Sequence, residues 1–113
     1  MKKLCDLLII AQKGMGNGDP ALSLELLGKY FNILIRDNRQ PAFIAFYNEG
    51  VKIVAENSEF TGQLQTLQER GVKMIVCSTC LDHYGIDNIV AGHKGTMPDI
   101  ITLQSDATKV LTL

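Results

Sequence analysis

The sequence predicts an α/β protein, a three-layer α/β/α sandwich around a mainly parallel five-stranded sheet. Short apolar runs alternate with longer segments in which apolar residues recur every three or four positions, as in strands that alternate with amphipathic helices. The strand candidates are almost continuously apolar, which is typical of parallel strands covered on both faces. The 113 residues, of which 46% are hydrophobic, suffice for a single domain over 1–113 with a core of its own.

The first half of the chain supplies two strands and two helices of this pattern. We expect a strand over 3–11, an amphipathic helix over 21–36, a strand over 41–46 and a short helix over 51–56. A loop with glycines at alternate positions, including Gly16 and Gly18, joins the first strand to the first helix. Asp19 is expected to cap that helix, and Pro20 to precede its apolar face at the first helical position.

The second half continues the alternation with shorter elements. We expect a helix over 63–70, a strand over 74–76, one or two helical turns over 81–84, a short strand within 86–91, a loop over 92–95, a helix over 96–105 and an edge or final strand over 109–113. Gly71 is expected to end the helix before it, Thr96 to cap the last helix, and Pro98 to lie in its first turn.

Two thiols stand where the strand over 74–76 meets a helix. Cys77 and Cys80 flank Ser78 and Thr79, both of which are candidate N-cap residues. The amino end of a helix favours an anion, and a thiolate is an anion. We therefore expect at least one of these thiols to be reactive, with a pKa lowered by the helix start.

Three loops should meet at one edge of the sheet, because the carboxyl ends of parallel strands lie together. They are residues 14–19, 47–50 and 77–80. Backbone N–H groups around Gly16 and Gly18 could hold a small anion. The GxGxG pattern differs from GxGxxG and argues against a nucleotide. Asn48 either caps the following helix or forms hydrogen bonds beside the thiols.

Charge and composition exclude several classes of function. The formal net charge is −1, so no basic excess is available to bind nucleic acid or an anionic membrane. No apolar run approaches the length of a membrane span. The three cysteines are an odd number, which favours a reducing cytoplasm over a disulfide framework, and Cys5 is expected in the core. No feature calls for a cofactor.

The loop sequences resemble those of the DsrE/DsrF-like family, and most of all the carboxyl-terminal domain of YedF-type, sulfurtransferase-like selenium-metabolism proteins. The motifs that carry the resemblance are Met15-Gly16-x-Gly18-Asp19, Phe46-Tyr47-Asn48-x-Gly50-Val51-Lys52, Gly71-Val72-x-x-x-x-Cys77-x-Thr79-Cys80-Leu81-Asp82-x-Tyr84-Gly85 and Thr96-Met97. The last stands where the family has Asn-Met and is the weaker match. The resemblance covers nearly the whole chain.

The resemblance implies a flavodoxin-like fold, homo-oligomers (often trimers or hexamers) and a persulfide held on cysteine. In the broader family pattern the active cysteine lies eight residues before the glycine that ends the turn, which corresponds to Cys77 counted back from Gly85. Cys80 is typical of the narrower YedF-like group, so the resemblance leaves the sulfur-bearing thiol open. The TusA-like domain of YedF-type proteins is missing, so the sulfur donor and acceptor are expected to be separate proteins or small thiols.

The residues also permit three other interpretations. A Cys-x-x-Cys between a strand and a helix suits a dithiol redox protein that uses Cys77 and Cys80. Cys77, Cys80 and His83 form CxxCxxH, although a structural zinc site needs a fourth ligand, and we expect no metal. His83 is then a surface residue or a proton donor near the thiols. The last interpretation is a non-catalytic oligomeric binding module.

Overall fold

In the computed structural model, which describes residues 2–113, a five-stranded parallel sheet has the order β6-β5-β4-β2-β7. Its strands are β2 (Leu7–Ile10), β4 (Phe43–Phe46), β5 (Lys73–Cys77), β6 (His93–Gly95) and β7 (Val110–Thr112). A separate short parallel pair joins β1 (Lys2–Lys3) to β3 (Arg39–Gln40). The predicted fold class, with its mainly parallel sheet, is confirmed.

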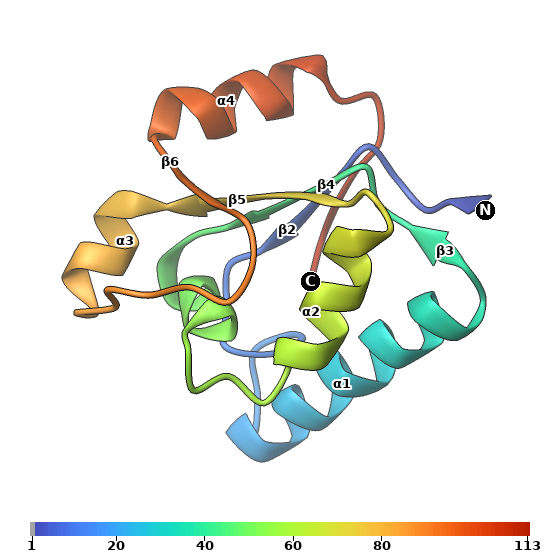
Figure 1. Cartoon of the computed structure of the whole chain (residues 1–113), viewed down its shortest axis with the longest axis horizontal. Coiled ribbons are helices and arrows are strands. Elements are labelled where there is room, and N and C mark those ends of the chain that lie inside the picture. The colour runs from blue at the N-terminus through green and yellow to red at the C-terminus, as the bar shows by residue number, and fades with distance from the viewer. Residues whose placement is uncertain (1) are drawn as a thin grey trace.

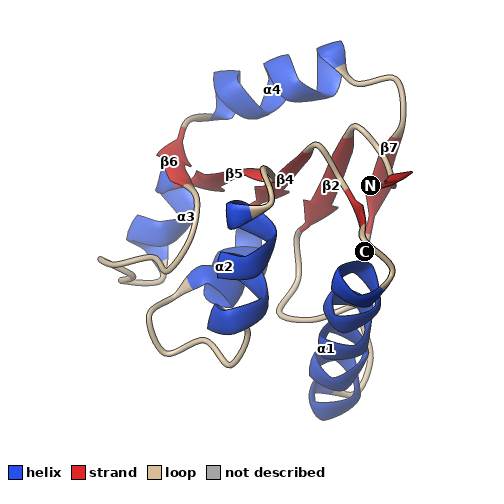
Figure 2. Cartoon of the chain, turned by 45° about the vertical axis from the view of Figure 1, so that its right-hand side comes forward, coloured by secondary structure: helices blue, strands red, loops and turns tan. Residues whose placement is uncertain are grey.

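Helices cover both faces of the sheet. They are α1 (Pro20–Arg36), the 3-10 helix η1 (Asn48–Val54), α2 (Thr61–Glu69), α3 (Ser78–His83) and α4 (Met97–Asp106). The sheet lies between α4 on one face and the pair α1 and α2 on the other (Figures 1 and 2). Helix α3 instead extends from the carboxyl end of β5, beyond the edge of the sheet (Figure 1).

Alternation along the strands divides the core into two parts, because successive side chains point to opposite faces. Leu8 and Ile10 belong to the larger core, which includes Phe31 of α1 and Leu64 of α2. On the other face, Leu7, Ile9 and Ala45 form a smaller cluster against which Leu103 and Ala107 pack, from α4 and its C-cap. Both faces of β2 and β4 are therefore buried, as their continuous apolar sequence predicts.

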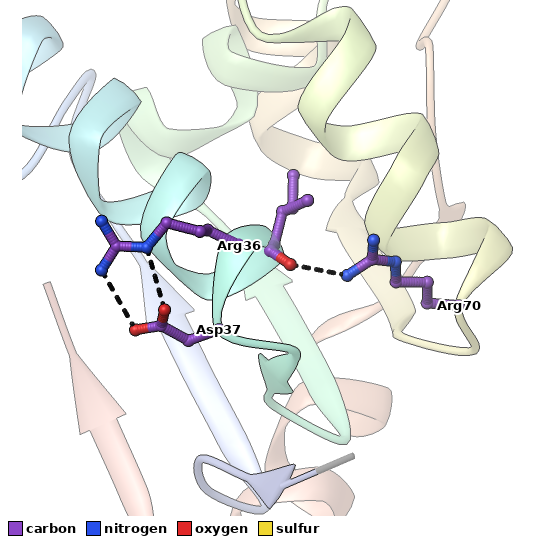
Figure 3. A network of polar contacts seen from close by, with 4 residues as sticks. Arg36, Asp37 and Arg70 are labelled. Carbon is purple, nitrogen blue, oxygen red and sulfur yellow. Dashed lines mark hydrogen bonds and ion pairs between the residues drawn. The ribbon is translucent and has the colours of Figure 1, made fainter.

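The first helix begins and ends as its sequence indicates. The Asp19 carboxylate accepts the Leu22 N–H (2.9 Å), and Pro20 takes the first helical position. At the other end, the Arg70 guanidinium donates to the Ile35 carbonyl (2.9 Å), while Arg36 pairs with Asp37 (Figure 3). Arg70 is the C-cap residue of α2, so this bond ties the ends of the two helices together.

Several of the predicted elements are wrong in type, position or length. The strand over 3–11 is shortened to Leu7–Ile10, because the Asp6 carboxylate accepts the N–H groups of Thr108 and Lys109 (2.8 and 2.7 Å) and holds the chain at that point. The short strand expected within 86–91 is absent from the described chain apart from a single bridge between Ala55 and Ile89. The expected loop over 92–95 contains β6, which pairs with β5.

The remaining elements agree with the sequence more closely. The helices expected over 21–36, 63–70 and 96–105 are confirmed to within two residues at each end. The helix expected over 51–56 is a 3-10 helix that starts earlier, at Asn48. Within residues 2–113, no helix has both the length and the apolar character needed to cross a bilayer.

Candidate functional site

The cysteine loop lies at the carboxyl edge of the sheet, beside the end of the neighbouring strand. Cys77 is the last residue of β5 and the N-cap of α3, and Cys80 lies in the first turn of that helix. Asn48 opens η1, two residues after β4 ends at Phe46. Because β4 and β5 are neighbouring parallel strands, with Phe46 opposite Val76, the two loops meet.

The two thiols differ in their access to solvent. Cys77 is 2% exposed and belongs to the larger core, whereas Cys80 is only partly buried. Cys80 opens into a hollow of about 380 Å³. The residues around this hollow come from three elements and the turn before η1, and they are Tyr47, Asn48, Thr79, Cys80, His83, Tyr84 and Met97. A bound group would therefore reach Cys80 first.

A chain of polar contacts leads to the Cys80 sulfur. The Asn48 backbone N–H donates to Cys80 Sγ at 3.1 Å, and the Tyr84 hydroxyl donates to Asn48 Oδ1 at 3.2 Å. Asn48 has a φ of 52°, in the left-handed region. The Lys52 ammonium lies 4.4 Å from the centre of the Tyr84 ring and pairs with Glu49 (3.3 Å).

The expected lowering of the thiol pKa at the helix start is wrong for Cys80. Burial raises the pKa of the Cys80 thiol, the Asn48 N–H opposes this effect, and the neighbouring Cys77 thiol raises the pKa further. The physical reason is local. The N–H that reaches the sulfur comes from η1 rather than from α3, and a second thiol stands beside it.

The predicted N-cap residues of α3 are also corrected. The helix begins at Ser78, so its N-cap is Cys77, and no side chain caps it. The Ser78 hydroxyl donates instead to the Gly95 carbonyl (2.7 Å) and ties α3 to β6. Thr79 lines the hollow beside Cys80. Of the two predicted residues, Thr79 lines the candidate site, whereas Ser78 fixes the start of α3 against β6.

Gly16 and Gly18 line a second hollow, also of about 380 Å³. Asn48 borders both hollows, so the glycine loop adjoins the thiol site without contributing to the wall of the Cys80 hollow. Gly16 has a φ of 80°, which a glycine adopts without strain. The three predicted loops therefore do meet at one edge, but they form two neighbouring hollows around Asn48.

Three features of the site were not predicted from the residues alone. Tyr84 follows Cys80 by four positions, which places both on one face of a helix, and this spacing could have indicated their proximity. Met97 comes from α4, so no local pattern links it to the thiols. Tyr47 belongs to the loop over 47–50 that the sequence places at this edge, but no pattern distinguishes its side chain from those of its neighbours. In the described part of the chain, no three His, Cys, Asp or Glu side chains gather closely enough to hold a metal ion.

Comparison with known proteins gives a family match over nearly the whole chain. The model of a family described as "DsrE/DsrF-like family" matches residues 2–113. Comparison with curated proteins gives no match. Among solved structures, the protein of unknown function MTH1491 from Methanobacterium thermoautotrophicum is similar, with a TM-score of 0.67, 19% identity and 100% of both chains covered.

Two further structures show the same fold. The ychN protein from E. coli has a TM-score of 0.69 and 19% identity, with 100% of both chains covered. The conserved protein of unknown function BT1422 from Bacteroides thetaiotaomicron has a TM-score of 0.61 and 17% identity, with 96% of this chain and 95% of that chain covered.

Proposed function

The chain belongs to the DsrE/DsrF-like family, a family associated with sulfur relay, and we propose that it carries or transfers sulfane sulfur as a persulfide on Cys80. The observation that carries this proposal is the placement of Cys80, which opens into a hollow and accepts a backbone N–H at its sulfur. A donor must reach the receiving sulfur along the line of the sulfur–sulfur bond that breaks. Cys77, at 2% exposed, is far less accessible to such a donor.

Loading would take place by thiolate attack on a donor persulfide. The Cys80 thiolate attacks the outer sulfur of R–S–SH, the bond between the two donor sulfurs breaks, and the donor leaves as R–S⁻. The product is Cys80–S–SH. The Asn48 N–H, 3.1 Å from Cys80 Sγ, stabilises negative charge on that sulfur before attack. The same steps apply to selenium in place of the transferred sulfur.

Delivery can follow either of two balanced routes. In the first, an acceptor thiolate attacks the outer sulfur and Cys80 leaves as a thiolate, which restores the starting state. In the second, the Cys77 thiolate attacks the inner sulfur of Cys80–S–SH and forms a Cys77–Cys80 disulfide, while the outer sulfur leaves as hydrogen sulfide. Cys77 is the N-cap of α3 and Cys80 lies three positions later in its first turn, a spacing that supports the closeness this second route requires.

The same pair of thiols supports a second candidate function, dithiol redox chemistry. In that case the pair loses two hydrogens to an oxidant and no sulfur is gained. The mass of the protein separates the two functions, because a persulfide adds one sulfur atom and a disulfide removes two hydrogen atoms. A non-catalytic binding module would show neither change.

The test is intact mass before and after incubation with a small-molecule persulfide, with and without dithiothreitol. We expect wild-type protein to gain one sulfur that dithiothreitol removes. Cys80→Ser should lose this gain. Cys77→Ser should keep it, because the buried thiol serves delivery rather than loading.

Cys5→Ala is the matched control for loss of a thiol. Cys5 is as buried as Cys77, but it precedes β2 and so lies at the amino end of the sheet, opposite the site. This variant should load sulfur as wild type does. Undiminished loading of Cys80→Ser would contradict the assignment of Cys80, and a loss of two hydrogens without sulfur gain would favour the redox function.

A further inference from the structure

We propose that Tyr84 is a positioning residue for the sulfur chemistry of Cys80 and that it acts through Asn48. This inference rests on the proposed function of Cys80 as the sulfur-bearing residue. Tyr84 differs from the groups that touch the sulfur, because its hydroxyl bonds to the Asn48 side chain and not to the thiol.

Asn48 adopts a backbone conformation that directs its N–H to the thiol. Its φ of 52° lies in the left-handed region, which is unfavourable for residues other than glycine, although asparagine tolerates it better than most. Such a conformation persists when the surrounding structure holds it. The hydrogen bond from the Tyr84 hydroxyl to Asn48 Oδ1 (3.2 Å) is the side-chain contact that holds this residue.

Tyr84 is itself held on two sides. The Lys52 ammonium lies 4.4 Å from the centre of its ring, and the His83 ring meets it edge-on with centroids 4.9 Å apart. Tyr84 also follows Cys80 by four positions, so one face of α3 and its C-cap presents both the thiol and the hydroxyl to Asn48. Cys80, Asn48 and Tyr84 therefore form a ring of contacts. The Asn48 backbone N–H binds the Cys80 sulfur, the Asn48 side chain binds the Tyr84 hydroxyl, and α3 joins Tyr84 to Cys80.

This ring of contacts affects the reactivity of Cys80, because an N–H dipole held in place stabilises a thiolate more than a mobile N–H does. If Asn48 relaxes from its conformation, its N–H turns away from Cys80 Sγ and the neutral thiol is favoured. Other ionisable side chains line the hollow or lie beside it. Cys77 is the N-cap of α3, His83 and Tyr84 lie at the other end of that helix, and Tyr47 stands in the turn before η1. Lys52 of η1 lies over the Tyr84 ring and pairs with Glu49, while α4 contributes the uncharged Met97 to the wall of the hollow.

The experiment measures the pH dependence of alkylation at Cys80 with iodoacetamide, read by peptide fragmentation in the mass spectrometer, which distinguishes Cys80 from Cys77 on the same peptide. In Tyr84→Phe, the aromatic ring remains for Lys52 and only the hydroxyl is lost. We expect the midpoint of the Cys80 profile to rise by about 0.5–1 pH unit. At pH 7 the alkylation rate should fall roughly two- to fourfold, since the lost thiolate is partly offset by the greater nucleophilicity of a more basic thiolate.

A double-variant cycle shows whether Tyr84 acts through Asn48. Asn48→Gly keeps the backbone N–H and the freedom to adopt positive φ, but removes the oxygen that accepts the Tyr84 hydroxyl. In that background Tyr84→Phe should add no further shift. A full additional shift would mean that the hydroxyl acts on Cys80 by another route, and it would overturn the proposal.

Tyr30→Phe is the matched control, because Tyr30 lies on α1 away from the hollow and loses the same hydroxyl. Its Cys80 profile should match wild type. A Tyr84→Phe profile that also matches wild type would overturn the positioning role. Alkylation requires no persulfide, so failure of wild type to load sulfur would reject the proposed function while the alkylation profiles still decide the role of Tyr84.

Discussion

Gly50 shows how closely the candidate site is joined to the centre of the sheet. This residue lies in η1, and a Cβ built on it would stand 1.9 Å from the Ile10 carbonyl oxygen at the end of β2. The obstructing atoms belong to the backbone of a central strand, so no side-chain rearrangement can relieve the clash. Glycine at this position lets the loop that carries Asn48 lie directly against the sheet.

The residue-scale prediction is that Gly50→Ala destabilises the protein by about 3 kcal/mol or more, because backbone must move to admit one methyl group. Urea unfolding followed by circular dichroism measures this change. The matched control is Gly62→Ala in α2, where, among the described residues, no atom outside the adjoining residues and the helix's own backbone lies within 4 Å of the added Cβ. The control should gain up to about 1 kcal/mol from helix propensity. Equal effects in the two variants would contradict the steric explanation.

At the scale of elements, one carboxylate adds side-chain hydrogen bonds to the backbone pairing that joins β7 to β2. Asp6 precedes β2, and its Oδ2 accepts the N–H groups of Thr108 and Lys109 immediately before β7. Lys3 pairs with the other oxygen of this carboxylate. The bond to Lys3, followed by the two backbone N–H groups, lowers the pKa of Asp6 from 3.8 to about 2.

This lowered pKa predicts how the stability of the protein depends on pH. Because the folded state favours the ionised carboxylate, the contribution of Asp6 is fully present above about pH 4 and is lost as the pH falls toward 2. Asp6→Asn should therefore reduce the free energy of unfolding at pH 7 and flatten its fall between pH 4 and 2.

Asp87→Asn is the matched control for this carboxylate. Asp87 is exposed, and no hydrogen bond to its carboxylate is found within the described residues. Chemical unfolding at a series of pH values gives both curves. An Asp6→Asn curve parallel to that of wild type between pH 4 and 2 would show that the carboxylate does not couple β2 to β7.

At the scale of the whole molecule, one face of α1 leaves apolar side chains exposed. Leu22, Leu26 and Ile33 are 50%, 39% and 46% exposed, and their spacing of four and seven positions places them on one side of the helix. The opposite side of α1 packs on the sheet through residues such as Leu27 and Phe31. An apolar stripe of this kind is typical of a surface that contacts another protein.

We propose that the protein is a homo-oligomer and that the exposed stripe on α1 supplies a contact between copies. Sedimentation velocity should show an oligomer for wild type and a smaller species for Ile33→Lys, because a buried unpaired ammonium opposes association. Ile101→Lys is the matched control on α4, at a side chain 55% exposed on the other face of the sheet. A monomeric wild type, or an oligomer lost only in Ile101→Lys, would contradict this assignment.

Local sequence pattern is sufficient to predict the buried strands and the first helix. The continuous apolar runs correspond to the buried strands β2, β4 and β5, and the segment with three- and four-residue apolar periodicity forms α1. These predictions succeed because burial on two faces, or on one helical face, requires that spacing of apolar residues. The same reasoning placed the three loops at one edge, since strands joined by helices run parallel.

Features that depend on pairing between distant segments do not follow from local pattern and are set by the folded chain. β6 has exposed side chains at His93 and Lys94, so its strand conformation comes from pairing with β5 rather than from an apolar pattern. The acidity of Cys80 likewise depends on burial, on Cys77 and on an N–H from η1, which the local helix-start rule omits. The sequence named both thiols, and the fold made one accessible and left the other buried, because exposure is set by what the rest of the chain packs against each sulfur.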